Sequence, residues 1–207
     1  MIEFRLGRCT FQLHFLFLAA LGIVLFTDAG PTALLGIAAV AIHECGHLLT
    51  MVLCGIPPHS VTIQPFGVLI HQREDHRKSY LRDGLVSLGG PVSNGIAMGV
   101  AAIAQRWLGV PMGEWLLVNA ALGIFNILPI ESLDGGRAVY CFLCIRQPPG
   151  RSERVVAVVS FVCLVPMSVI GFLFLLESRY NFSLLLASVY LMLCLVLKNR
   201  RLLHRTA

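Results

Sequence analysis

The chain has 207 residues, of which 57% are hydrophobic and only 13% are charged, and its formal net charge is +5. A soluble domain has about 25% charged residues, so this composition excludes an ordinary soluble protein and indicates a polytopic membrane protein. The positive charge follows no pattern typical of nucleic-acid binding, so we expect it to reflect membrane topology and anionic lipid rather than a nucleic-acid partner.

Runs free of Asp, Glu, Lys and Arg predict the membrane-spanning helices, because about 20 apolar residues are needed to cross the hydrocarbon. One run is interrupted only by Glu44. We predict an all-α polytopic membrane protein with six transmembrane helices in a single domain, 1–207. Its core is 31–137, and 138–207 holds a cytoplasmic connection and two C-terminal helices. The runs are 9–27, 32–54, 84–105, 115–130, 155–176 and 180–197.

The distribution of positive residues predicts the orientation of these helices. All but Arg106 and Arg179 of the 16 Lys and Arg residues fall on the side of the two termini. Cytoplasmic loops carry the excess of Lys and Arg, so we expect an integral membrane protein with both termini in the cytoplasm.

The second run contains an H-E-x-x-H motif formed by His43, Glu44 and His47. Residues four apart share one face of a helix, so the two imidazoles can bind one zinc ion while Glu44 acts as the catalytic base. Two core histidines would be the alternative. Glu44 is the only Asp, Glu, Lys or Arg in 29–72, however, and an ionisable group at bilayer depth costs at least about 2.5–3.5 kcal/mol. The motif lies in the second half of its helix, so we expect the metal inside the membrane but nearer the cytoplasm.

After the second helix, two short β-branched segments flank a Pro-Phe-Gly turn, a pattern typical of a small hairpin. The segments are 61–64 and 68–71. We expect a membrane-associated β-hairpin beside the active site, where its edge could pair with an extended substrate. An ordinary cytosolic hairpin remains an equal alternative.

The third run opens with glycines and a proline and contains Asn94, a polar residue in an apolar helix. Gly95 and Gly99 form a G-x-x-x-G pattern that favours close helix approach. Asn94 is expected either to make an interhelical hydrogen bond or to hold a substrate carbonyl or the developing oxyanion, and the residues leave both readings open.

The end of the fourth run predicts the third metal ligand. Pro129 breaks the helix, and Gly135 and Gly136 permit a sharp turn that would direct Asp134 back into the bundle. Two histidines and one carboxylate complete a zinc site with one open position, and we expect one zinc per chain. Spacing alone leaves Glu131 as a rival for Asp134.

These motifs together resemble the site-2 protease family of intramembrane zinc metalloproteases, and the six-span layout is most similar to the stage IV sporulation protein FB group. The resemblance implies that His43, His47 and Asp134 bind zinc and that Glu44 activates water. Asn94 and Asn126 would help to hold the substrate or the site itself. The residues of the structural motif are Gly90, Pro91, Pro129, Gly135 and Gly136.

The same resemblance implies a bacterial cell-membrane enzyme that cleaves a membrane-tethered protein near the cytoplasmic face. Such substrates are often precursors or inhibitors of transcription factors, including sigma factors, and a membrane regulatory partner is expected. The nucleotide-sensing C-terminal domain of the sporulation group is not expected here, because only ten residues follow the last run.

Two other functions use the same residues. A divalent-metal transporter would use the histidines and the carboxylate as a transit site, but the last two runs offer no polar path. A catalytically silent scaffold would keep the fold alone. A Glu44→Gln substitution separates these hypotheses, because only a protease would lose activity through it.

Overall fold

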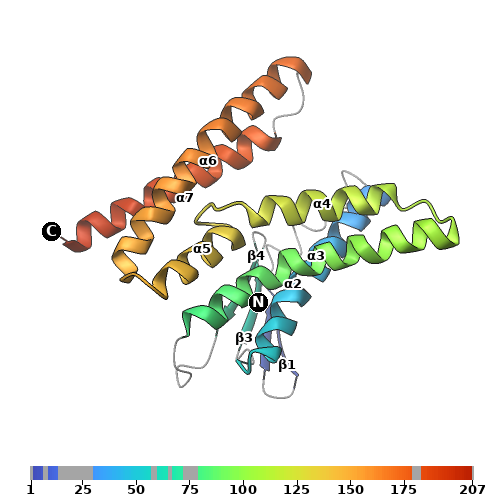
Figure 1. The fold of residues 1–207 in the computed structure, drawn as a ribbon, viewed down its shortest axis with the longest axis horizontal. Helices are drawn as coiled ribbons and strands as arrows, with labels where there is room; N and C mark the ends of the chain where they lie inside the picture. The colour runs from blue at the N-terminus through green and yellow to red at the C-terminus, as the bar shows by residue number, and fades with distance from the viewer. Residues whose placement is uncertain are drawn as a thin grey trace. The chain divides into compact units, whose positions relative to one another are not determined.

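The computed structural model describes residues 2–6, 9–13, 30–56, 60–64, 67–71, 79–178 and 183–206. The chain divides into two compact units, Met1–Phe125 and Asn126–Ala207. Each unit is described by itself (Figure 1).

Three helices dominate the first unit: α2 (Pro31–Leu53), α3 (Tyr80–Leu108) and α4 (Gly113–Ile127). Helix α2 starts at a proline, whose missing N–H has no helical partner at that position anyway. Helix α3 contains Pro91 and ends at Gly109, whose positive φ of 67° suits glycine at a helix terminus. Helices α2 and α3 lie against each other along their length (Figure 1).

The first unit also contains a four-stranded sheet of order β1-β2-β3-β4. The strands are β1 (Ile2–Leu6), β2 (Cys9–Leu13), β3 (Ser60–Gln64) and β4 (Gly67–His71). Strands β2 and β3 are parallel, whereas the β1–β2 and β3–β4 pairs are antiparallel. A parallel pair needs a long crossover, and α2 lies within it. Membrane association of β3 and β4 stays a prediction.

The predicted first transmembrane helix is wrong in its opening residues, because Cys9–Leu13 forms β2. Its charge-free composition resembled a membrane run, but pairing with Ser60–Gln64, about fifty positions away, gives these residues their conformation. The rest of that predicted helix, 14–27, lies outside the described residues.

The second unit consists of α5 (Asp134–Cys144), α6 (Pro149–Ser178) and α7 (Ser183–Thr206). Helix α5 packs on α6, and α6 packs along α7. We predicted a connection across 138–154, so α5 and the early start of α6 were both missed. The charged residues that suggested a loop lie on these helices instead, as Arg137 and Arg151 do.

The helices expose apolar side chains and bury polar ones, which is the reverse of the pattern in a soluble protein. Along α3, Val92, Ile96 and Val100 are 56–63% exposed, whereas Asn94 is 0% exposed. Outward apolar faces of this size mark contact with lipid, so the protein is an integral membrane protein.

Three described helices are long and apolar enough to cross a membrane: Thr32–Leu53, Tyr80–Leu108 and Pro149–Leu173. Two shorter apolar helices cover Gly113–Ile127 and Leu184–Leu197. The six-span count and the cytoplasmic termini stay predictions.

Candidate metal centre

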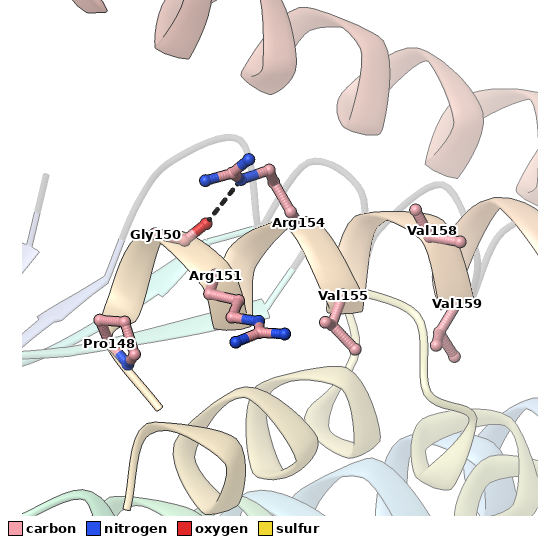
Figure 2. A pocket seen from close by; sticks show the side chains of 7 residues that line it. All are labelled: Pro148, Gly150, Arg151, Arg154, Val155, Val158 and Val159. Atoms are coloured by element: carbon pink, nitrogen blue, oxygen red, sulfur yellow. Dashed lines mark hydrogen bonds between the residues drawn. The ribbon is translucent and has the colours of Figure 1, made fainter. Parts of the chain in front are cut away.

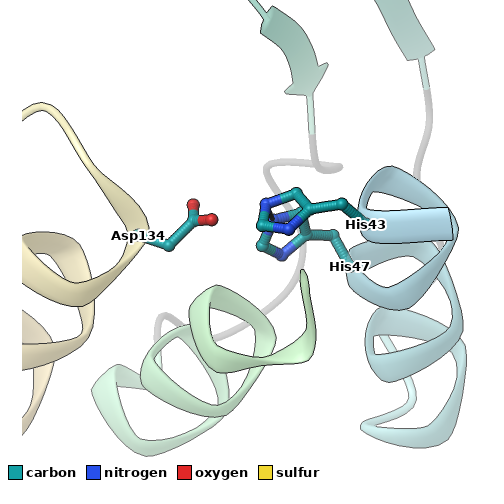
Figure 3. A group of neighbouring side chains, drawn as sticks. All are labelled: His43, His47 and Asp134. Atoms are coloured by element: carbon teal, nitrogen blue, oxygen red, sulfur yellow. Dashed lines mark hydrogen bonds between the residues drawn. The ribbon is translucent and has the colours of Figure 1, made fainter. Parts of the chain in front are cut away.

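His43 and His47 project from one face of α2 with their rings side by side (Figure 3). Both are buried, at 5% and 8% exposure, and their Nε2 atoms lie 3.3 Å apart. Zinc binds imidazole nitrogen at about 2.0–2.1 Å, so two ligands at the tetrahedral angle should lie about 3.3–3.4 Å apart. The two nitrogens are therefore spaced as ligands of one ion.

The outer ring nitrogens determine the protonation of both histidines. His47 Nδ1 lies 2.8 Å from the Val86 carbonyl oxygen, which can only accept, so Nδ1 carries the proton and donates. His43 Nδ1 lies 2.6 Å from Asn94 Oδ1, also an acceptor. In the neutral imidazoles, both Nε2 atoms then hold the lone pairs. Two lone pairs at this separation repel each other, so the arrangement suits a cation shared by both nitrogens. Histidines that bind a metal through one ring nitrogen typically donate a hydrogen bond from the other, as both rings do here.

Gly90 lies directly beneath this pair of nitrogens. A Cβ built on Gly90 would overlap His47 Nε2 and would lie 2.5 Å from His43 Nε2. The missing side chain therefore lets both imidazole nitrogens lie against the α3 backbone, which forms a cradle for the two rings. This geometry fits the predicted zinc and explains why glycine precedes Pro91 at this point of α3.

Small residues bring α2 and α3 close enough to form the cradle. A Cβ on Gly46 would overlap the Gly89 carbonyl and Ser93 Oγ, so the backbones are in near contact. Ser93 Oγ donates across the interface to the Ile42 carbonyl at 3.0 Å. Among the residues that the structure describes, nothing lies within 4 Å of a Cβ at Gly95 or Gly99. Among the described residues, Gly46 and Gly89 provide the close approach of α2 and α3, and a G-x-x-x-G contact at Gly95 and Gly99 stays a prediction.

Glu44 follows His43 on α2 and is half-buried. Consecutive helix positions differ by about 100° around the axis, so its carboxylate flanks the face that carries the two imidazoles. A carboxylate in this position can exchange protons with a group held between the histidines.

Asp134 is the first residue of α5 and is half-buried. A carboxylate in the first helical turn is stabilised by the helix dipole and exposed N–H groups. Figure 3 labels Asp134 together with His43 and His47, and its role as the third ligand stays a prediction. Glu131 is the rival for that position. It lines a cavity of 290 Å³ in the second unit with Arg137 and Glu153.

Gly135 and Gly136 act differently from the sequence prediction. Both lie in the first turn of α5, and neither has a positive φ. A Cβ on Gly135 would overlap the Ile127 carbonyl, and one on Gly136 would overlap the Ile130 carbonyl. These glycines therefore permit the start of α5 to pack against the preceding loop, and they are not needed for a sharp turn.

The loop around Pro129 is held by a serine that we did not predict. Ser160 of α6 is 0% exposed, and its Oγ accepts a hydrogen bond from the Glu131 backbone N–H at 2.8 Å. The same hydroxyl donates to the Val156 carbonyl at 2.7 Å. Helix α6 thus positions the loop that leads to Asp134.

Asn94 lies behind His43, away from solvent. Besides its bond to His43, it donates through Nδ2 to the Ala39 carbonyl at 3.3 Å and to Asn119 Oδ1 at 2.9 Å. Both N–H groups are used within the protein, which favours the structural reading of Asn94 over substrate contact. Asn126 lies half-buried near the end of α4, and its role stays a prediction. We did not predict a role for Asn119, although it is the one amide in the apolar stretch from Leu116 to Phe125.

A separate cavity of 690 Å³ follows the first turns of α6 (Figure 2). Arg154 bends back so that its Nε donates to the Gly150 carbonyl at 3.3 Å. None of the lining side chains is a metal ligand or a nucleophile. They are Pro148, Gly150, Arg151, Arg154, Val155, Val158 and Val159.

Comparison with known proteins gives consistent results. Residues 80–167 match Peptidase family M50. A putative zinc metalloprotease of Synechocystis sp. is 33% identical over 113 residues, which cover 52% of this chain and 30% of that protein. The putative zinc metalloprotease Rip3 of Mycobacterium tuberculosis is 29% identical over 150 residues, covering 63% of this chain and 37% of Rip3. The chain thus spans about a third of the length of these curated relatives.

Two matches come from Methanocaldococcus jannaschii. A zinc metalloprotease is 25% identical over 158 residues, covering 73% of this chain and 44% of that protein. The solved structure of a site-2 protease aligns with a TM-score of 0.60 at 24% identity, covering 92% of this chain and 91% of that one. The fold is therefore that of a site-2 protease, and the matches support a zinc metalloprotease.

Proposed function

We propose that this chain, a relative of peptidase family M50 with the fold of a site-2 protease, is an intramembrane zinc metalloprotease. The observation that carries the proposal is the pair of lone-pair-bearing Nε2 atoms, 3.3 Å apart over Gly90, on apolar helices. The Nδ1 contacts with Asn94 Oδ1 and the Val86 carbonyl leave both Nε2 atoms available as ligands in the neutral rings.

In this proposal His43, His47 and Asp134 hold one zinc ion. When bound, zinc supplies Lewis acidity that lowers the pKa of water to about 7 and polarises a peptide carbonyl. Glu44 takes a proton from the attacking water at its carboxylate and delivers it to the nitrogen of the leaving segment. Val86 and Asn94 keep the Nδ1 protons in place while this occurs.

The substrate is proposed to be a membrane-tethered protein, cleaved in or near its transmembrane segment. The histidines are buried between helices, and a helical peptide bond is hydrogen-bonded and shielded, so the substrate has to unwind locally before cleavage. Strand β4 ends the sheet, and its free edge could pair with the extended segment by strand addition. Substrates with helix-breaking residues near the cleavage site should therefore be preferred.

The finer assignment concerns the biological context. On motif resemblance we place the chain with the stage IV sporulation protein FB group, acting in a bacterial cell membrane near the cytoplasmic face. Cleavage would release or activate a transcription factor, such as a sigma factor, and a membrane partner would regulate access. The charge distribution supports cytoplasmic termini, since only Arg106 and Arg179 fall on the opposite side.

Co-expression with a panel of membrane-tethered transcription-factor precursors tests the proposal. The parent protein is compared with Glu44→Gln and Asp134→Ala by immunoblot of the precursor. We expect shortened precursor with the parent alone. Equal shortening with Glu44→Gln would reject the mechanism. Absence of shortening with every precursor, in cells where the parent accumulates in the membrane, would reject this substrate class.

A further inference from the structure

Asn119 is a buried amide that neither contacts the metal ligands nor lies near them in the sequence. It sits on α4 at 0% exposure, within an apolar stretch from Leu116 to Phe125 that holds no other polar side chain. A polar group in such a place is retained only if its hydrogen bonds are satisfied. The direction of those bonds shows what Asn119 does.

Asn119 has only one orientation that satisfies its neighbours. Its Nδ2 lies 3.0 Å from the Trp115 carbonyl, which can only accept, so this atom must be the amide nitrogen. Its Oδ1 consequently faces Asn94 and accepts from Asn94 Nδ2 at 2.9 Å.

The orientation of Asn94 follows from that of Asn119. Asn94 Nδ2 gives one hydrogen to Asn119 Oδ1 and the other to the Ala39 carbonyl at 3.3 Å. Its Oδ1 is then left facing His43 Nδ1 at 2.6 Å. An amide oxygen cannot donate, so His43 carries a proton on Nδ1, and its neutral ring then has the lone pair on Nε2 beside Gly90.

The two ligating histidines are therefore held in different ways. His47 Nδ1 bonds directly to the backbone carbonyl of Val86, whose polarity cannot change. His43 Nδ1 bonds to a side-chain amide, which could rotate by 180° and present its NH2 group instead. That rotation would require the proton of His43 on Nε2, where it would exclude a metal.

We propose that Asn119 is a positioning residue for the metal centre, which fixes the tautomer and ring orientation of His43 through Asn94. The amide relay runs from the Trp115 carbonyl on α4 through Asn119 and Asn94 to His43 on α2. The proposal rests on the proposed role of His43 as a metal ligand. Outer contacts of this kind typically change metal affinity by about 10–100-fold when they are removed.

Asn119→Ser is the informative variant. Several serine and threonine hydroxyls on these helices bond to the carbonyl four residues earlier, as Thr50 does to Gly46 at 2.8 Å and Ser168 does to Leu164 at 2.9 Å. A serine at 119 should likewise satisfy the Trp115 carbonyl and allow folding, but it is too short to accept from Asn94. Asn119→Asp, protonated in this apolar setting, keeps one acceptor oxygen for Asn94 and one hydroxyl donor for Trp115.

The experiment measures Co²⁺ affinity and the visible absorption spectrum of Co²⁺ in the purified full chain, together with thermal unfolding. We expect Asn119→Ser to bind Co²⁺ about tenfold or more weakly with an altered spectrum, and Asn119→Asp to stay near the parent. Ser188→Ala is the matched control, because Ser188 is also 0% exposed and, within the part of the chain that the structure describes, its hydroxyl bonds to the Leu185 carbonyl of its own helix. This control should leave the Co²⁺ affinity and the Co²⁺ spectrum unchanged.

A double-mutant cycle with Asn94→Leu tests whether Asn119 acts through Asn94. Asn119→Ser should have no further effect on Co²⁺ affinity in that background. Parental affinity and spectrum in Asn119→Ser, or additive losses in the double variant, would overturn the proposal. No peptide substrate is involved, so failure of proteolysis would leave this test intact, whereas a parent that binds no Co²⁺ would reject the metal centre itself.

Discussion

A single methyl group at position 90 should abolish metal binding. Gly90→Ala places a Cβ that overlaps His47 Nε2 and lies 2.5 Å from His43 Nε2. An ordinary contact between such atoms is about 3.5 Å, so each imidazole has to withdraw by roughly 1 Å. Metal sites tolerate changes of only about 0.2 Å in ligand distance. The displaced nitrogens therefore cannot hold a common ion.

Gly95→Ala is the matched control on the same helix. Among the described residues, nothing lies within 4 Å of a Cβ at Gly95. Both substitutions gain about 0.5–1 kcal/mol of helix propensity, so that contribution cancels in the comparison. Zinc per chain, measured by mass spectrometry of the purified proteins, should fall below about a tenth of an equivalent for Gly90→Ala and stay parental for Gly95→Ala. Parental zinc content in Gly90→Ala would refute the requirement for glycine beside the two imidazoles.

Two further predictions concern the supports of the site. Ser160→Ala leaves the Glu131 backbone N–H without its partner, so thermal unfolding should show a loss of about 1–3 kcal/mol. Ser168→Ala, which removes only a bond within its own helix, should cost less, and equal losses would contradict the loop-holding role. Gly46→Ala forces a methyl group into the α2–α3 interface and should lower the free energy of unfolding by about 1–3 kcal/mol. For Gly36→Ala on the same helix, none of the described residues lies within 4 Å of the new Cβ, and unfolding measurements should find the variant neutral or slightly stabilised.

The metal ligands on α2 could be predicted because their information is local. His43 and His47 are four residues apart, and helix periodicity alone places them on one face. The bounds of that helix also came close, with 32–54 expected and Pro31–Leu53 observed. Glu44 stood out because no other charged residue interrupts the surrounding apolar run.

The supporting residues could not be predicted because their roles depend on other segments. Asn119 and Ser160 each look like isolated polar residues in apolar runs until Asn94 and the Glu131 backbone are placed beside them. Strand β2 could not be predicted for the same reason, since its conformation depends on pairing with β3 far along the chain. Periodicity within one window carries no information about such partners.

The glycines show a related limit. Sequence patterns identify where glycine is unusual, but they do not distinguish a turn from a close backbone approach. Gly135 and Gly136 were expected to make a turn and instead pack against carbonyl groups, while a Cβ at Gly95 would meet none of the described residues within 4 Å. Only the neighbouring backbone decides between these roles.

The most direct test of the account is metal-dependent cleavage by the purified protein in proteoliposomes that contain a membrane-tethered substrate. Zinc is removed with a chelator, added back in known amounts, and cleavage is measured for the parent and for Glu44→Gln. The account predicts that parental cleavage is lost on chelation and returns as zinc reaches one equivalent, while Glu44→Gln binds the same zinc and does not cleave. Cleavage that persists without zinc, or that Glu44→Gln performs at the parental rate, would contradict it.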